Sequence, residues 1–157
     1  MKGFRPVLLI GLVAVGCAKW EPPAPPAPRT GMEVAAPAAK TWDAVIDVFS
    51  ARNIPIFTLD RSSGFIAAEE MRVPPVEKRG TASPYADCGV FMKIPQSPTH
   101  ANYNIRVKGD STRSTVLVTV LWKDLYDPTN GGTMQCSTKG AWETDAEKEI
   151  KALAEKR

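Results

Sequence analysis

One stretch of alternating residues constrains the fold more than any other part of the chain. Ser114–Trp122 places valine or tryptophan at every second position from Val116, with leucine or threonine between them. Period-two alternation is typical of a β-strand, and apolar residues on both faces indicate a central place in a sheet. A second alternating stretch, Tyr103–Lys108, precedes it across the turn Gly109–Ser111. We therefore expect an antiparallel sheet built around these two strands.

Shorter segments complete the expected sheet. The turn cluster Asp60–Gly64 joins two of them into a hairpin, and Pro74 ends the second. The short strands are expected at Met32–Val34, Ile54–Leu59, Phe65–Val73 and Val90–Ile94. After the loop Asp127–Gly132, the segment Met134–Cys136 is expected to bring the Cys136 thiol within reach of Cys88.

Two helices are expected, because apolar residues recur at helical spacing near both ends of the folded part. The first spans Lys40–Asn53, with Thr41 as its cap. The second spans Ala141–Lys156, where Thr144–Glu147 fits a capping box, although a start before this box stays open. The apolar stripes are Trp42, Val45, Ile46 and Phe49 in the first helix, and Trp142, Ala146, Ile150 and Leu153 in the second.

The order of these elements predicts an α+β fold. Helices at the N-terminal and C-terminal ends of an antiparallel sheet are expected to pack together on one of its faces. Residues 40–157 suffice for one hydrophobic core. A signal peptide at residues 1–16 and a Pro/Ala-rich linker at residues 17–39 are expected to precede this domain.

The N-terminus has the pattern of a secretory signal. Lys2 and Arg5 precede the apolar run Val7–Val15, which is shorter than the roughly 20 residues needed to cross a bilayer core. Ala14-Val15-Gly16-Cys17 resembles the bacterial lipobox. That resemblance implies removal of residues 1–16, a diacylglycerol on the Cys17 thiol and an acylated amine. An ordinary signal peptide with a chance cysteine, or an uncleaved anchor, is the alternative.

The residues after Cys17 bear on the location and reach of the chain. Ala18 stands where an aspartate would favour the inner membrane, so the periplasmic leaflet of the outer membrane is favoured. Residues 18–39 are rich in proline and alanine, which predicts an extended polyproline II spacer. At about 3.1 Å per residue such a spacer would reach roughly 70 Å and lift the domain off the membrane.

The three cysteines are consistent with an exported protein. With Cys17 as the anchor, Cys88 and Cys136 remain, and an even pair in an oxidising compartment usually forms a disulfide. Two separate buried thiols are the alternative. No metal site is expected, because the cysteines lack CxxC spacing and His100 is the single histidine.

Charge and motifs argue against other function classes. The chain has 20 basic and 17 acidic residues, and loss of Lys2 and Arg5 with the signal leaves it nearly neutral, so no nucleic-acid partner is expected. Ser62-Ser63-Gly64 is not a nucleophile elbow. Asp60, Glu69 and Glu70 are better explained as a solvated face than as an acid–base set. We therefore expect a non-enzyme without a cofactor.

Two segments carry a family resemblance. Tyr85-Ala86-Asp87-Cys88-Gly89 and Cys136-Ser137-Thr138, in this order of elements, are similar to small proteobacterial lipoproteins of unknown function with a BamC-like domain. The resemblance covers most of the chain from Met32; an inserted Lys139 and a long Pro-rich loop before Asn102 depart from it. It implies a helix-grip α+β fold and a Cys88–Cys136 bridge, and it supplies no catalytic residue.

Two functions are compatible with these sequence features. The first is a non-catalytic, lipid-anchored envelope lipoprotein whose periplasmic domain binds another envelope protein or assists an assembly. The second is a periplasmic carrier of a small molecule or lipid between helix and sheet. A cavity between the helical stripe of residues 42–49 and the Val116–Val120 face would favour the carrier, and a filled interior would favour the binding module.

Overall fold

A long hairpin forms the centre of the sheet. In the computed structural model, β8 (His100–Gly109) and β9 (Ser114–Asp124) pair antiparallel along their whole length. Side chains alternate between buried and more exposed positions along both strands. Both strands are longer than the sequence predicts, and the central place expected for the Ser114–Trp122 segment is confirmed. The structure describes residues 19–70, 73, 81–125 and 131–157.

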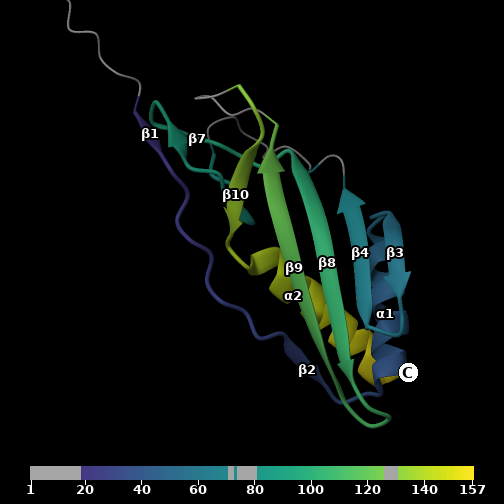
Figure 1. The fold of residues 1–157 in the computed structure, drawn as a ribbon. Helices are drawn as coiled ribbons and strands as arrows, with labels where there is room; N and C mark the ends of the chain where they lie inside the picture. Colours follow the sequence, from purple (N-terminus) through teal and green to yellow (C-terminus); the bar gives the residue numbers. More distant parts are fainter. Residues whose placement is uncertain (1–18, 71–72, 74–80, 126–130) are drawn as a thin grey trace, which may run out of the picture.

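Further antiparallel strands extend the sheet on both sides in the order β3-β4-β8-β9-β10-β5 (Figure 1). The predicted hairpin is present as β3 (Ile56–Asp60) and β4 (Phe65–Glu70). On the other side, β10 (Met134–Thr138) pairs with the end of β9 and with the short β5 (Ala86–Asp87).

The strand expected at Met32–Val34 is β2, and it pairs with Ser114–Val116 at the start of β9. Since β8 occupies one edge of β9, β2 and β10 share the other edge. They leave residues 117–121 between them without a strand partner on that side, among the described residues. We call this stretch the interrupted edge of β9.

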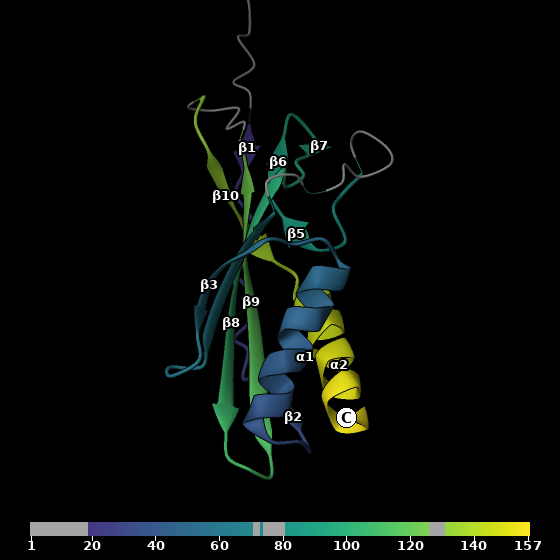
Figure 2. The ribbon, with the colours of Figure 1, turned by 90° about the vertical axis from the view of Figure 1, so that its right-hand side faces the viewer.

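Both helices lie on the same face of the sheet and pack side by side (Figure 2). α1 spans Ala38–Ala51 and α2 spans Ala141–Lys156. The layered α+β arrangement is therefore as predicted. Among the described residues, no helix is long and apolar enough to span a membrane.

The predicted caps are wrong. Pro37 precedes the first turn of α1, so Thr41 lies inside the helix, fully buried, with its hydroxyl 2.7 Å from that of Ser114. α2 begins directly after Gly140, so Thr144 and Glu147 lie beyond its start instead of forming a capping box. A buried hydroxyl can satisfy a partner across the core, and this competes with capping.

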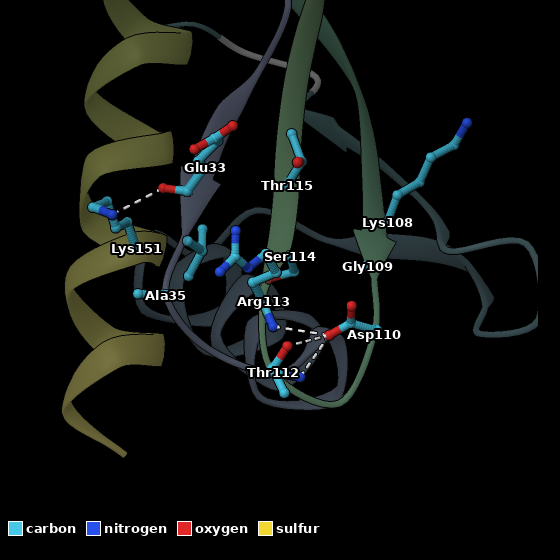
Figure 3. A pocket seen from close by; sticks show the side chains of 11 residues that line it. Glu33, Ala35, Lys108, Gly109, Asp110, Thr112, Arg113, Ser114, Thr115 and Lys151 are labelled. Atoms are coloured by element: carbon cyan, nitrogen blue, oxygen red, sulfur yellow. Dashed lines mark hydrogen bonds between the residues drawn. The ribbon is translucent and has the colours of Figure 1, made fainter.

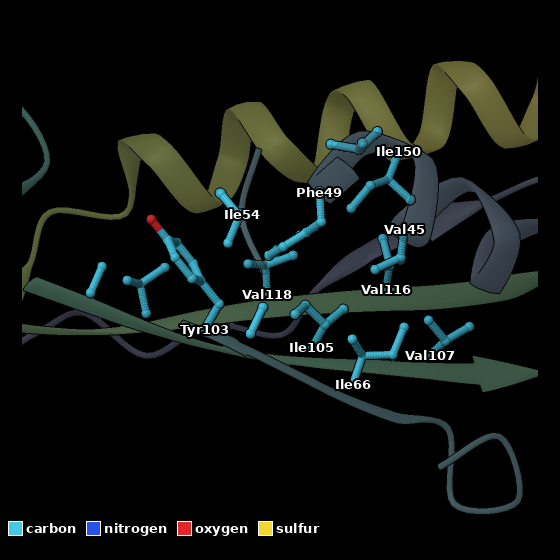
Figure 4. Packing of buried hydrophobic residues seen from close by; sticks show 14 of the residues in the cluster. Val45, Phe49, Ile54, Ile66, Tyr103, Ile105, Val107, Val116, Val118 and Ile150 are labelled. Atoms are coloured by element: carbon cyan, nitrogen blue, oxygen red, sulfur yellow. The ribbon is translucent and has the colours of Figure 1, made fainter. Parts of the chain in front are cut away.

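The core fills the space between the helices and the sheet (Figure 4). Val45 and Phe49 of α1 and Ile150 of α2 pack against the inner face of the sheet, which includes Val116 and Val118. All five side chains are completely buried. The position at which a carrier would hold its ligand is thus filled by side chains.

The hydrophobic core extends to residues before the domain boundary that was expected at residue 40. Val34 and Ala36 are buried in the core, and β2 belongs to the sheet. We call residues 19–36 the N-terminal strap. They run along the domain instead of forming a free spacer, because they contribute two strands and two core residues.

A second, small sheet lies at one end of the molecule. It contains β1 (Trp20–Glu21), β6 (Val90–Phe91) and β7 (Ile94–Pro95). The single strand expected at Val90–Ile94 is therefore wrong: the chain turns at Met92 and Lys93, which both have positive φ angles. Residues 1–16, Cys17 and residues 71–72 of the expected Phe65–Val73 strand lie outside the described residues.

Candidate functional site

The two segments that carry the family resemblance meet at a disulfide. Cys88 and Cys136 are bridged, as predicted, and their Cα atoms are 4.2 Å apart. The Tyr85 ring stacks on that of Trp122 with 9° between the planes. The Tyr85–Gly89 segment is thereby fixed to the end of the main sheet.

The same segment holds the start of the strap. The Asp87 carboxylate accepts hydrogen bonds from the backbone N–H groups of Ala24 (3.0 Å) and Gly89 (2.9 Å). Gly89 has a φ of +78°, and a Cβ atom there would lie 2.6 Å from Cη2 of Trp20. Glycine is required here because the backbone needs a left-handed conformation and the Trp20 ring approaches it closely. The segment is therefore a docking place for the strap.

Arg29 fixes the middle of the strap at the interrupted edge of β9. Its guanidinium binds the Glu147 carboxylate at 2.7 Å and donates to the Gly140 carbonyl and the Thr144 hydroxyl. The other Glu147 oxygen accepts the Val118 N–H at 2.9 Å. The Glu147 carboxylate thus accepts the Val118 N–H hydrogen bond that the carbonyl group of a neighbouring strand would otherwise have accepted.

This polar cluster is largely removed from water. The side chains of Arg29 and Glu147 are 18% and 4% exposed. Glu143, one turn earlier on α2, is fully buried and bonds to the Thr138 hydroxyl. Charge-assisted hydrogen bonds in such surroundings are stronger than at a solvated surface. Sequence reasoning missed this cluster, because Glu143 and Glu147 fall within a helical pattern that alone suggests a solvated face.

A polar depression of about 560 Å³ lies beside the β8–β9 turn (Figure 3). Lys151 donates to the Glu33 carbonyl and to Glu155, and so ties α2 to β2. Asp110 accepts from the Thr112 hydroxyl and from the Thr112 and Arg113 N–H groups, which lowers its pKa to about 2. These contacts stabilise the β8–β9 turn and the position of β2. We therefore interpret the depression as ordinary solvated surface and not as a binding site.

A smaller cavity of about 190 Å³ lies near the disulfide. The Arg52 guanidinium sits 4.8 Å from the centre of the Trp142 ring at this cavity. Trp122 is 1% exposed, and its Nε1–H has no hydrogen-bond partner among the described residues. A buried donor without a partner costs free energy. The lining residues are Arg52, Ile54, Val73, Tyr85, Tyr103, Trp122 and Trp142.

The carboxylates considered for acid–base chemistry lie in a turn or on the solvent-exposed surface. Asp60 accepts hydrogen bonds from the Ser62 and Ser63 hydroxyls, which lower its pKa to about 2 and stabilise the β3–β4 turn. Glu69 is exposed. His100 has its Nδ1 3.1 Å from the Thr99 hydroxyl. Within the described ranges, no group of three or more potential metal ligands comes together.

The outer strand of the hairpin carries exposed apolar side chains. Phe57 is 63% exposed and lies at the irregularity between Ile56 and Thr58, and Leu59 is 55% exposed. Among the described residues β3 pairs only with β4, so its other edge offers unpaired backbone groups. This edge is the most evident place for a protein contact on the main sheet.

Comparison with protein-family models found no match, and comparison with curated proteins found none either. The similarity to BamC-like lipoproteins therefore stays a prediction from the residues quoted above.

Proposed function

We propose that the protein is a lipid-anchored lipoprotein of the bacterial envelope whose folded domain binds another envelope protein. Cys17 is its acylated residue, and the periplasmic leaflet of the outer membrane is its favoured location. The domain acts without catalysis, as an interaction or assembly-accessory module of the helix-grip, BamC-like kind.

The filled interior is the observation that carries this proposal over the carrier function. Val45, Phe49 and Ile150 occupy the space between the helices and the Val116–Val118 part of β9. A ligand between the apolar stripe of α1 and the Val116–Val118 part of β9 would have to displace these side chains. A protein partner needs only the surface, and the surface offers an open strand edge.

The edge of β3 is the contact that we assign to the partner. An extended segment of another protein can add a strand to an exposed sheet edge through backbone hydrogen bonds, while side chains provide selectivity. Phe57 and Leu59 would supply apolar contact beside that added strand.

Site-specific photo-crosslinking in intact cells tests this proposal. A photoreactive residue at Phe57 or Leu59 is expected to form an adduct with the same envelope protein. The control position is Arg106, an exposed residue of β8. A second substitution, Leu59→Asp, is expected to abolish the adduct formed from position 57. Equal adducts from position 106, or adducts that survive Leu59→Asp, would contradict the assignment.

The aromatic cavity favours one alternative, a carrier of a small ligand. The cavity of 190 Å³ has several aromatic residues in its lining and suits a compact molecule. Native mass spectrometry of the domain purified from the periplasm distinguishes the two functions. A retained small molecule that is lost in a Trp122→Phe variant would favour the carrier, and a bare protein mass would favour the binding module.

A further inference from the structure

The tether between the proposed anchor and the domain is very short. Only Ala18 and Lys19 separate Cys17 from Trp20, where the strap joins β6. Three Cα–Cα steps reach at most about 11 Å even when the backbone is fully extended. The Lys19 carbonyl already accepts the Met92 N–H at 3.4 Å. A chain anchored at Cys17 therefore begins its folded contacts at the membrane surface.

The strap cannot lengthen this tether without losing its contacts. Trp20 and Glu21 pair with Phe91 and Val90, Asp87 holds Ala24, and Arg29 is bound to Glu147. Release of the strap would also remove Val34 from the core. The roughly 70 Å reach expected for a free spacer, at about 3.1 Å per residue, is therefore not available to the folded protein.

The end of the molecule next to the tether carries side chains suited to a lipid surface. At the β6–β7 turn Met92 is 60% exposed and Ile94 is 51% exposed, with the exposed Lys93 between them. Leu125, 56% exposed, follows β9 at the same end of the molecule (Figure 1). Apolar side chains beside a lysine suit the bilayer interface, since the apolar groups enter it and the ammonium group stays at the headgroups.

The conformation of this turn supports a role for its side chains. Met92 and Lys93 have φ angles of 48° and 66°, a pair of left-handed residues that two-residue hairpins usually fill with Asn-Gly or Gly-Gly. Larger residues at such positions cost free energy, and they cluster where a side chain is needed. The turn thus presents an apolar and a basic side chain at its tip.

We propose that this end of the molecule, formed by β1, the β6–β7 turn and Leu125, lies in the interfacial layer of the phospholipid membrane that holds Cys17. The inference rests on the proposed acylation of Cys17 and adds an orientation to it. The opposite end, with the β8–β9 turn, then points away from the bilayer, and the β3 edge stays accessible to a partner (Figure 2).

Fluorescence quenching by spin-labelled lipids tests this orientation. The full-length acylated protein is reconstituted into vesicles of phosphatidylethanolamine and phosphatidylglycerol, with an environment-sensitive fluorophore on Met92→Cys. The matched control carries it on Thr112→Cys, an exposed position in the β8–β9 turn at the far end. We expect the emission of the fluorophore at position 92 to be blue-shifted. Lipids that carry the spin label near the headgroup should quench most of this fluorescence. The fluorescence at position 112 should not change.

Each other outcome has a distinct meaning. Vesicle-bound, acylated protein with an unquenched probe at position 92, or with equal quenching at both positions, would overturn the orientation and leave the anchor intact. A blue shift at position 92 without quenching by the spin-labelled lipids of the vesicles would indicate a protein contact at this end and would also overturn it. Protein whose intact mass lacks the acyl groups would overturn the proposed anchor itself. The Cys88–Cys136 disulfide, checked in each variant, reports correct folding.

Discussion

At the scale of single residues, Arg29 has the largest consequence for how the chain is held. Its guanidinium joins the strap to Glu147, which itself holds the Val118 N–H at the interrupted edge of β9. Removal of Arg29 would leave a nearly buried carboxylate without its charge partner. The cost of such a loss exceeds that of a solvated ion pair.

We therefore expect Arg29→Ala to lower the free energy of unfolding by about 2 kcal/mol, because it leaves Glu147 unpaired. Urea unfolding of the oxidised soluble domain, residues 18–157, measures this. The matched control is Arg61→Ala, since the exposed Arg61–Asp43 pair at 3.4 Å should contribute less than about 0.5 kcal/mol. Limited proteolysis should also show earlier cleavage within residues 19–31 of the Arg29 variant. Equal stability and equal protease resistance in both variants would contradict the role of Arg29.

At the scale of elements, the disulfide joins the Tyr85–Gly89 segment, on which the strap docks, to β10. Cys88 and Cys136 are 48 residues apart, so the chain-entropy model predicts about 4 kcal/mol of stabilisation for the bridge. We expect a reducing agent to lower the melting temperature of the soluble domain. The Cys88→Ser/Cys136→Ser variant should melt at that lower temperature with or without reductant. An unchanged melting temperature of the wild type on reduction would mean that the bridge does not stabilise the domain.

The elements differ in how far sequence reasoning could find them. The long alternation of β9 and the stripe of α1 identified those elements, because each reports burial on a repeated face. The part of the strap before β2 was missed. A Pro/Ala-rich composition predicts an extended chain, and an extended chain can be either free or paired. Whether the strap is free or paired depends on residues distant in the sequence, such as Asp87 and Glu147. Local sequence patterns do not predict such contacts.

The candidate site was predictable only in part. The pairing of Cys88 with Cys136 was predicted from the expected export of the chain and from the resemblance, and the structure confirms it. The buried position of Glu147 did not, because a glutamate on a helix is mostly solvated unless a partner and a backbone donor enclose it. The β6–β7 turn was equally hidden, since Met92 and Lys93 are not common residues in a tight turn.

At the scale of the whole molecule, three features act together. The strap brings residue 20 against the β6–β7 end, the helices and sheet form a filled core, and the β3 edge stays open. An anchor at Cys17 would then hold the domain close to the bilayer instead of at the end of a long spacer. The partner would approach the side of the sheet that carries Phe57 and Leu59.

Everything about membrane attachment depends on the Cys17 thiol, and metabolic labelling with a clickable fatty-acid analogue tests it most directly. Cells that produce the wild-type protein are compared with cells that produce Cys17→Ser, and label on the immunopurified protein is measured. We predict label on the wild type and none on the variant, which should also leave the membrane fraction. Equal label on both proteins, or an unlabelled wild type that retains residues 1–16, would contradict the proposed anchor.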